Sequence, residues 1–345
     1  CYKKLSMSKK NSNVNLKNGF INYKDLSEIF FNFKSKLEVL GKKKYVVAVS
    51  GGPDSLALVA LTKAYAFKNK TKFFYLLIDH NLRKNSNLEA QKVKKLLKKN
   101  NINLKIFLNK KKIKTNIQAN ARNIRYDILS NYCKKNNIKV ILTGHNLEDQ
   151  VETFLIRLSR GSGLKGLSAM KPVSKINTQV SLFRPLLDIK KQFLIKISKN
   201  IFGKYFKDPS NKDLKYLRTK VRSLKKPLEK SGIKYEQIFK SIQNLSLSKK
   251  TLDDYLNTVF KKLIRKKDKE ILININKYRD LNKDTQIAII NESVKQLKNN
   301  YYDIRSKKVE NLIKKVNKRD FKKSTLGGCI FSKKGENLCL KEEKN

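Results

Sequence analysis

A turn that contains two adjacent glycines constrains the fold of this chain more than any other feature of its sequence. An apolar, β-branched run at residues 45–49 precedes the turn and the apolar segment 56–61 follows it; between them stands Ser50-Gly51-Gly52-Pro53-Asp54-Ser55. This order predicts a strand, a tight loop and a buried helix. Such a loop directs backbone N–H groups and a helix N-terminus at one point, which favours the binding of phosphate.

The turn is not the common G-x-x-x-x-G-K-[ST] phosphate loop, because the lysine of that motif is missing and Asp54 is present instead. Taken alone, the glycine pair fits a phosphate site and an ordinary strand-to-helix turn of an α/β domain equally well. The choice between these two interpretations depends on the rest of the chain.

Strand-like and helical patterns alternate over the first two thirds of the chain. The strand-like runs lie at 45–49, 73–79, 104–108 and 139–143, and the helical patterns between them lie at 56–68, 88–99 and 117–135. A further helix is expected from about Asp25, and Ser86 with Glu89 predicts a capping box at the start of the helix 88–99. The alternation predicts an α/β fold with βαβ units and a parallel sheet.

The two histidines of the chain, His80 and His145, each follow the end of a predicted strand. In an open parallel sheet, ligands bind outside the carboxyl ends of the strands. We therefore expect both histidines on the same edge of the sheet as the glycine turn. Two histidines and four scattered cysteines without a C-x-x-C do not predict a zinc site, and the cysteines are expected to be reduced and structural.

The segment that contains His145 carries the second strong pattern, Thr143-Gly144-His145-Asn146-Leu147-Glu148-Asp149-Gln150-Val151-Glu152-Thr153. Asn146 predicts a helix N-cap, with Asp149 at the N3 position. At about 100° per residue, His145, Asp149 and Glu152 lie on one stripe of that helix. Paired carboxylates beside a phosphate site suit Mg²⁺, and a neutral histidine can orient a substrate or move a proton. Helix capping by Asp149 and a solvated Glu152 explain the pattern as well.

Two further patterns are compatible with a nucleotide site. The sequence Asp79-His80-Asn81-Leu82-Arg83 ends the second predicted strand, where Asp79 can meet a nucleotide or a metal, or can simply belong to a loop. Arg122 and Arg125 stand three residues apart on a predicted helix, a spacing that suits phosphate. In so basic a chain, a solvated helix face is the simpler explanation for the two arginines.

The charge of the chain favours polyanionic partners. Eighty Lys and Arg residues stand against 28 Asp and Glu, a formal net charge of +52 over 345 residues. A field of that sign attracts RNA or DNA. Lys, Asn and Ile all have AT-rich codons and are all abundant, so the charge alone does not locate a binding site. No window approaches the ~18 consecutive apolar residues of a membrane span.

Changes in composition and periodicity along the sequence predict three segments. Residues 1–24 read as a loose basic tail, 25–230 as the α/β domain and 231–345 as a smaller, mainly helical and lysine-rich domain. Near the end, Leu326-Gly327-Gly328-Cys329 and residues 338–340 predict a closing hairpin or a short strand pair.

Six motifs in a fixed order resemble the PP-loop ATP pyrophosphatases, and within them the bacterial tRNA(Ile)-lysidine synthetases. They are the turn Ser50–Ser55, Asp79-His80-Asn81-Leu82-Arg83, Ala121-Arg122-Asn123-Ile124-Arg125-Tyr126, the segment Gly144–Thr153, Arg160-Gly161-Ser162-Gly163-Leu164-Lys165-Gly166-Leu167 and Arg184-Pro185-Leu186-Leu187. Asp208-Pro209-Ser210-Asn211, Arg218 and Arg222 continue the match, whereas Thr219 departs from the Asn that commonly follows the first of these arginines. The likeness is strong over residues 42–230 and loose beyond.

The resemblance implies an ATP-dependent ligase. It would join free L-lysine to C2 of the first anticodon cytidine of a tRNA(Ile) with a CAU anticodon, through an adenylated base. ATP would be held by Ser50, Gly51, Gly52, Pro53, Asp54 and Ser55, with Asp79 and Arg122. Catalysis would fall to His145, Asp149, Glu152, Arg218 and Arg222, and Mg²⁺ to Asp54, Asp149 and Glu152. The lysine-rich helices after residue 230 would contact the tRNA backbone in a cytoplasmic enzyme, and a homodimer is left open.

Two alternatives remain. A tRNA thiolation enzyme with the same loop would need a reactive cysteine or a cysteine-held cluster, for which Cys133, inside a predicted helix, is a poor candidate. A non-catalytic basic RNA-binding protein would fit the composition, but it leaves the glycine turn and the stripe of His145, Asp149 and Glu152 without a purpose.

Overall fold

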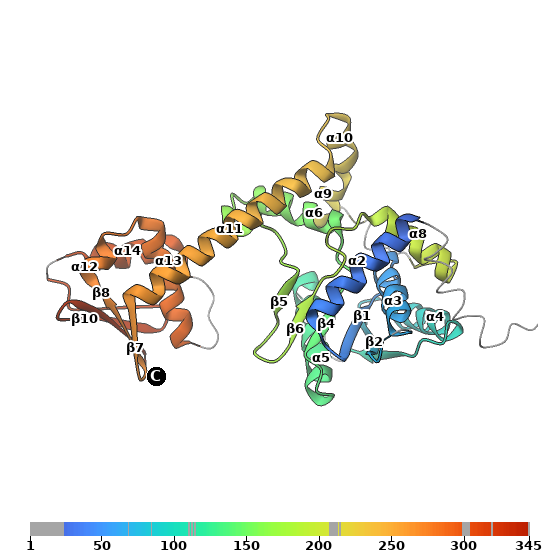
Figure 1. Ribbon diagram of the computed structural model, residues 1–345, viewed down its shortest axis with the longest axis horizontal. Helices are drawn as coiled ribbons and strands as arrows, with labels where there is room; N and C mark the ends of the chain where they lie inside the picture. Colours follow the sequence, from blue (N-terminus) through green and yellow to red (C-terminus); the bar gives the residue numbers. More distant parts are fainter. Residues whose placement is uncertain are drawn as a thin grey trace, which may run out of the picture. The chain divides into compact units, whose positions relative to one another are not determined.

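The computed structural model divides into two compact units, Cys1–Leu245 and Ser246–Asn345, each with a hydrophobic core of its own (Figure 1). The described residues are 24–67, 69–83, 85–109, 111, 113, 115–206, 213, 215–298, 304–318 and 320–343. The predicted tail at 1–24, except for its last residue, and the motif Asp208-Pro209-Ser210-Asn211 lie outside the described residues.

The first unit alternates helices with short strands, as the sequence predicts. Its strands are β1 (Lys44–Val49), β2 (Lys72–Asp79), β3 (Leu104–Leu108), β4 (Val140–Leu142), β5 (Val173–Lys175) and β6 (Ser181–Phe183). Its helices are α2 (Lys24–Leu40), α3 (Pro53–Ala66), α4 (Ser86–Lys99), α5 (Ile117–Lys135), α6 (Leu147–Leu158), α7 (Leu164–Leu167), α8 (Lys191–Phe202), α9 (Leu217–Ser223) and α10 (Lys225–Lys230). Helix α11 (Tyr235–Leu263) contains the division between the units.

The sheet of the first unit has the strand order β3-β2-β1-β4-β6-β5. Neighbouring strands run parallel except β5, which is antiparallel to β6. The α/β fold and the parallel sheet are therefore confirmed. Because β2 and β4 lie on opposite sides of β1, the strand order reverses at β1, and open sheets bind ligands in the crevice beside such a reversal.

Helices cover both faces of this sheet (Figure 1), which explains why every residue of β1 after Lys44 is apolar. Tyr45, Val47 and Val49 belong to a core made with α2, α3, α4 and α8, whereas Val46 and Ala48 belong to a second core made with α5. Successive residues of a strand face opposite sides, so an alternating pattern would have left one face of β1 polar.

One predicted cap is wrong. Helix α4 begins at Ser86 itself, with Asn85 as its N-cap residue and no side chain capping it among the described residues. The Ser86 hydroxyl is buried and has no hydrogen-bond partner in the described part of the chain. By contrast, the predicted cap of α6 is confirmed, because Asn146 and Asp149 form a reciprocal capping box.

The second unit corrects the expectation of a mainly helical domain. It contains a five-stranded antiparallel sheet with the order β7-β8-β11-β10-β9. The strands are β7 (Ile264–Lys267), β8 (Glu270–Asn274), β9 (Lys323–Leu326), β10 (Cys329–Lys334) and β11 (Asn337–Glu342), and the helices besides α11 are α12 (Ile275–Arg279), α13 (Lys283–Leu297) and α14 (Ser306–Val316). Apolar residues of the sheet and of these helices form one core, which includes Ile273, Ile290, Val309 and Phe331.

The predicted strand pair near the end of the chain is confirmed as two hairpins. Gly327 and Gly328 link β9 to β10, with φ of +62° and +71°. Positive φ at both central residues is the conformation that two-residue hairpins require and that glycine adopts without strain. In the described residues of both units, none of the helices has the length and apolar character needed to cross a membrane.

Candidate active site

The candidate site lies where three parallel strands end side by side. Strand β1 leads into the glycine turn, β2 leads into Asp79 and His80, and β4 leads into His145. Because the strands are parallel neighbours, their carboxyl ends share one edge of the sheet. The predicted common position of the two histidines and the glycine turn is therefore confirmed.

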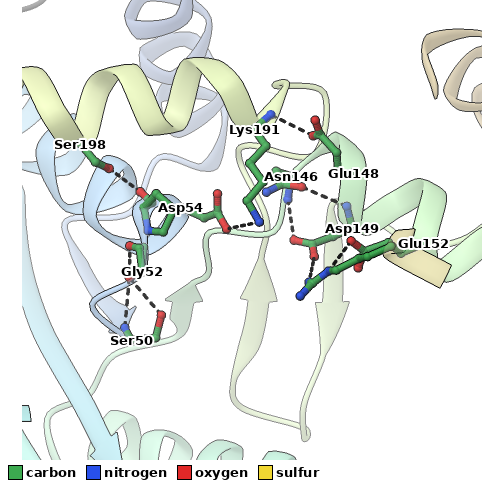
Figure 2. Close-up of polar contacts among 12 residues, drawn as sticks. Ser50, Gly52, Asp54, Asn146, Glu148, Asp149, Glu152, Lys191 and Ser198 are labelled. Atoms are coloured by element: carbon green, nitrogen blue, oxygen red, sulfur yellow. Dashed lines mark hydrogen bonds and ion pairs between the residues drawn. The ribbon is translucent and has the colours of Figure 1, made fainter. Parts of the chain in front are cut away.

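The glycine turn, residues 50–55, is held in shape by the Ser55 hydroxyl. Ser55 Oγ accepts the Ser50 N–H at 3.1 Å and donates to the Gly52 carbonyl oxygen at 3.0 Å (Figure 2). Pro53 occupies the first turn of α3, and among the described residues no side chain caps the N-terminal N–H groups of this helix. A helix start without a side-chain cap keeps its N–H groups available for an anion, as the phosphate-site prediction requires.

Gly144 brings the end of β4 against this turn. A Cβ atom built on Gly144 would lie 2.7 Å from the Asp54 carbonyl oxygen and 3.2 Å from the Ser55 nitrogen. Both atoms belong to the backbone and cannot rotate away, so only glycine fits here. The close approach places His145 and the first turn of α6 directly beside the glycine turn.

Asp54 is a carboxylate with too few partners. Its Oδ1 atom is buried without a hydrogen bond among the described residues, and its Oδ2 atom lies 3.8 Å from Lys191 Nζ (Figure 2). Burial raises the pKa of Asp54 to about 6, although the charge of Lys191 acts in the opposite direction. A partly buried, under-coordinated carboxylate beside a phosphate site suits a divalent cation.

His145 stays neutral at physiological pH. Burial first, and then the charges of nearby arginines, Arg184 foremost, lower its pKa to about 3. Its Nδ1 atom lies 2.8 Å from Thr143 Oγ1, which fixes the ring. His80 is also neutral, since burial and Arg125 lower its pKa to about 4. Both rings can exchange hydrogen bonds with a substrate but do not act as cations.

Asp149 and Glu152 are paired with the two predicted arginines. Glu152 Oε2 accepts from Arg218 Nε at 2.7 Å, and Glu152 Oε1 accepts from Arg222 Nε at 2.6 Å. Asp149 Oδ1 lies 3.2 Å from Arg218 Nη2 and 3.7 Å from Arg222 Nη2. Two carboxylates of α6 thus face two guanidinium groups of α9, four residues apart on that helix.

This ion cluster, made of Asp149, Glu152, Arg218 and Arg222, brings together four of the five predicted catalytic residues. Asp149 and Glu152 are also two of the three predicted metal ligands, and the arginines already balance their negative charges. Among the described residues, no group of three or more His, Cys, Asp or Glu side chains is close enough to hold a metal. Of the predicted metal ligands, Asp54 alone retains a buried oxygen with no hydrogen-bond partner in the described part of the chain.

The two remaining predicted site residues differ in exposure. Asp79 is 4% exposed, and its Oδ1 atom accepts the Asn81 N–H at 2.9 Å, while its Oδ2 atom is buried without a hydrogen bond in the described residues. Arg122 is exposed and its guanidinium lies 4.9 Å from the centre of the Tyr126 ring. Asp79 therefore resembles Asp54, whereas Arg122 is available at the surface.

Sequence reasoning missed a cavity beside the ion cluster. The cavity has a volume of about 300 Å³ and is lined by Glu148, Glu152, Lys191, Gln192, Ile195, Arg222, Lys225 and Tyr235. Tyr235 is 2% exposed and its hydroxyl has no hydrogen-bond partner among the described residues. Glu148 and Lys191 lie in recognised motifs or beside them. Only the tertiary structure shows that Glu148 of α6 and Lys191 of α8 line this cavity together.

Comparisons with known proteins agree with this geometry. A PP-loop domain model matches residues 25–228. The tRNA(Ile)-lysidine synthase of Wolbachia pipientis wMel is 33% identical over 323 residues, which cover 92% of this chain and 75% of that protein. The chain belongs to the tRNA(Ile)-lysidine synthase family. Its activity is that of a tRNA(Ile)-lysidine synthase, a ligase with a PP-loop ATP-binding domain.

Two further comparisons concern the sequence and the fold. The tRNA(Ile)-lysidine synthase of Orientia tsutsugamushi (strain Boryong) is 43% identical over 204 residues, or 57% of this chain and 45% of that protein. Among solved structures, the U34-tRNA thiolase NcsA from Methanococcus maripaludis is similar with a TM-score of 0.51 and 19% identity, covering 69% of this chain and 79% of that one. At that identity, the thiolase shows the shared fold alone.

Proposed function

We propose that the first unit adenylates C2 of the first anticodon cytidine in a tRNA(Ile) with a CAU anticodon, and that free L-lysine then displaces AMP. The observation that carries this proposal is the close approach of Gly144 to the backbone of Asp54. That contact sets a neutral histidine and an under-coordinated carboxylate around one phosphate-binding turn, as a reaction at the α-phosphate of ATP requires.

The first step forms an O–P bond and breaks another. The C2 oxygen of cytidine attacks the α-phosphorus of ATP, and the bond to the bridging oxygen breaks, so that pyrophosphate leaves with its electron pair. The glycine turn and the N-terminus of α3 bind the phosphates through backbone N–H groups. The neutral His145 ring then serves as a hydrogen-bond partner for the base or the adenylate, since a pKa of about 3 excludes a standing positive charge.

The residues present fit a magnesium ion at one point. We propose that Asp54 holds it, because the buried Oδ1 atom has no other partner among the described residues. Magnesium typically binds one or two carboxylates together with substrate phosphates, and it would offset the charge that develops on the pyrophosphate. We place neither Asp149 nor Glu152 on the metal, because both carboxylates already face arginines.

In the second step, an amine of lysine attacks C2, the C2–O bond breaks and AMP leaves, while the amine loses a proton. Lysine is a zwitterion, so its pocket needs groups of both signs. The 300 Å³ cavity offers Glu148 and Glu152 with Lys191, Arg222 and Lys225, together with a Tyr235 hydroxyl that has no partner in the described chain. We propose that this cavity receives the amino acid.

The ion cluster joins that cavity to the adenylate. Arg218 and Arg222 are each about a third exposed, at 34% and 31%, so both remain accessible to a phosphate group. We propose that Asp149 and Glu152 act as positioning residues that hold the two arginines toward AMP. Arginine suits this task because its planar guanidinium can face a carboxylate and a phosphate at the same time.

Oxygen tracing tests the adenylated base. A CAU-anticodon tRNA(Ile) carrying ¹⁸O at C2 of the first anticodon cytidine is incubated with the enzyme, ATP and lysine, and the AMP is examined by mass spectrometry. Transfer of the label to AMP is expected, because the C2 oxygen leaves with the phosphate. Unlabelled AMP from a reaction that still incorporates lysine would instead mean that ATP activates lysine itself.

No observation favours thiolation. The described cysteines Cys133, Cys329 and Cys339 are all free and buried. Burial raises the pKa of the Cys133 thiol to about 12, which opposes formation of a reactive thiolate.

A further inference from the structure

The glycine turn lacks the lysine of the common phosphate loop, but a lysine from a different element stands beside it. Lys191 is the first residue of α8 and follows β6 by only a few residues. Its Nζ atom lies 3.8 Å from Asp54 Oδ2, and Figure 2 shows its side chain extended from α8 toward the first turn of α3. The Lys191 side chain is 37% exposed, so it is accessible to a ligand.

Two contacts fix the position of Lys191. Glu148 Oε2 accepts the backbone N–H of Lys191 at 2.8 Å, so a carboxylate of α6 caps the first turn of α8 (Figure 2). Within α8, the buried Ser198 hydroxyl donates to the Pro53 carbonyl oxygen, which ties α8 to the start of α3. The Lys191 backbone is thereby anchored to both helices that border the glycine turn.

Resting on the proposed function, we infer that Lys191 binds the β- and γ-phosphates of ATP and that Glu148 is the positioning residue that holds Lys191 in place. A triphosphate beside Asp54 puts several negative charges on one side of the turn. Backbone N–H groups supply only partial charges, and one magnesium ion would balance only part of the charge of a triphosphate, so a further full positive charge helps to stabilise the pyrophosphate as it leaves. Lys191 supplies that charge from α8 instead of from α3.

An ion pair with Asp54 alone does not account for Lys191. At 3.8 Å the Lys191 ammonium and the Asp54 carboxylate are beyond hydrogen-bond distance. A lysine whose purpose was to neutralise Asp54 would lie within hydrogen-bond distance of it. The gap between the two groups instead matches a site that closes around a ligand bearing phosphates and a cation.

Equilibrium binding of the α,β-methylene analogue of ATP and of AMP, in the presence of magnesium, tests this inference. Replacing Lys191→Ala should weaken binding of the triphosphate analogue about tenfold or more and leave AMP binding within about twofold, because AMP lacks the two outer phosphates. Lys191→Arg should restore most of the affinity. Lys190→Ala is the matched control: it removes the same charge one residue away, from an ammonium that pairs with Glu236 at 2.7 Å.

A test of Glu148 must separate the positioning of Lys191 from direct binding of ATP by Glu148. Glu148→Ala, which removes the cap, should weaken the analogue several-fold without affecting AMP, and Glu148→Gln should restore affinity because its amide oxygen can still accept the Lys191 N–H. In the Lys191→Ala background, Glu148→Ala should add nothing further, since the residue that it positions is absent.

The outcomes separate this inference from the proposed function. Equal affinities of wild type and Lys191→Ala for the analogue, with melting temperatures unchanged, would overturn the role of Lys191 while leaving the ATP site standing. Parallel loss of analogue and AMP binding would also overturn it, because that result marks a general distortion of the turn. Failure of the wild type to bind the analogue at all would overturn both proposals.

Discussion

At the scale of single residues, the site contains carboxylates whose effects on the stability of the unliganded protein have opposite signs. Glu152 is buried but paired with two guanidinium groups, whereas Asp54 is partly buried and its Oδ1 atom, which is itself buried, has no hydrogen bond within the described chain. Burial without compensation destabilises the charged form. Asp54 therefore opposes folding at neutral pH, which is expected of a residue kept for binding rather than for stability.

Asp54→Asn should stabilise the unliganded protein and abolish adenylation. The folded-state pKa of about 6 lies above the ordinary value of 3.8, so the folded protein binds a proton more tightly than the unfolded chain does. The stability that this proton supplies is full below pH 3.8 and is lost as pH rises through 6. At pH 8 the variant should gain about 1–3 kcal/mol in chemical denaturation, and the gain should vanish near pH 4. A loss of stability at pH 8 would contradict the assignment.

Gly144→Ala tests the close approach at the glycine turn. The added Cβ would meet two backbone atoms of α3, so the turn must shift. Such overpacking costs about 1–3 kcal/mol in unfolding free energy, and ATP-analogue affinity should fall more steeply than stability. Gly163→Ala is the matched control, because nothing lies within 4 Å of its Cβ and its φ is −78°. Normal nucleotide affinity in Gly144→Ala would show that the contact does not shape the site.

At the scale of elements, the sequence of the first unit predicted where most helices and strands lie, but not which of them pack together. The periodicity of 139–158 placed β4 and the Asn146 cap correctly and put Asp149 and Glu152 on α6, whereas His145 precedes the N-cap and lies outside that helix. The partners of that stripe, Arg218 and Arg222, lie about 70 residues away, and no local pattern states that α9 packs on α6. The two arginines were singled out by resemblance, but their pairing with the carboxylates depends on tertiary packing.

The strands of the second unit were missed for a similar reason. Strands β7 and β9 carry lysine and are only four residues long, and β7 directly follows the long helix α11. Short basic strands at a sheet edge have little apolar alternation to detect. The hairpin of β9 and β10 was recognisable because Gly327 and Gly328 mark its turn.

Helix caps give a prediction at this scale. Asn146→Ala removes a side-chain oxygen that accepts the Asp149 N–H at 3.0 Å and breaks the capping box. It should cost about 1 kcal/mol and lower activity, because Asp149 helps to hold Arg218. Ser86→Ala should have little effect on stability, since the Ser86 hydroxyl caps nothing in the described residues. The two variants can be compared by urea denaturation, and equal costs would contradict the cap assignment.

At the scale of the whole molecule, we relate the net charge of +52 to tRNA binding rather than to catalysis. We propose that the second unit contributes to tRNA binding through its lysines, as expected from the composition after residue 230. Each phosphate contact releases counterions, so affinity falls steeply with salt.

Salt dependence measures this contribution in the full chain. From about 50 to about 200 mM KCl, tRNA affinity should fall ~100-fold or more, as several phosphate contacts imply. Binding of the ATP analogue should fall far less over the same range, because it has few phosphates. Filter binding and fluorescence titration can record the two. A weak salt dependence of tRNA binding would mean that the lysines of the chain make few contacts with the tRNA phosphates.

Incorporation of labelled lysine into tRNA tests the lysidine synthase activity itself. The enzyme is supplied with labelled L-lysine, Mg-ATP and a tRNA(Ile) transcript with a CAU anticodon, beside a transcript in which the first anticodon base is changed from C to U. We expect label on the first RNA only when ATP is present, and none on the second. Label that appears without ATP, or equally on both transcripts, would contradict this expectation.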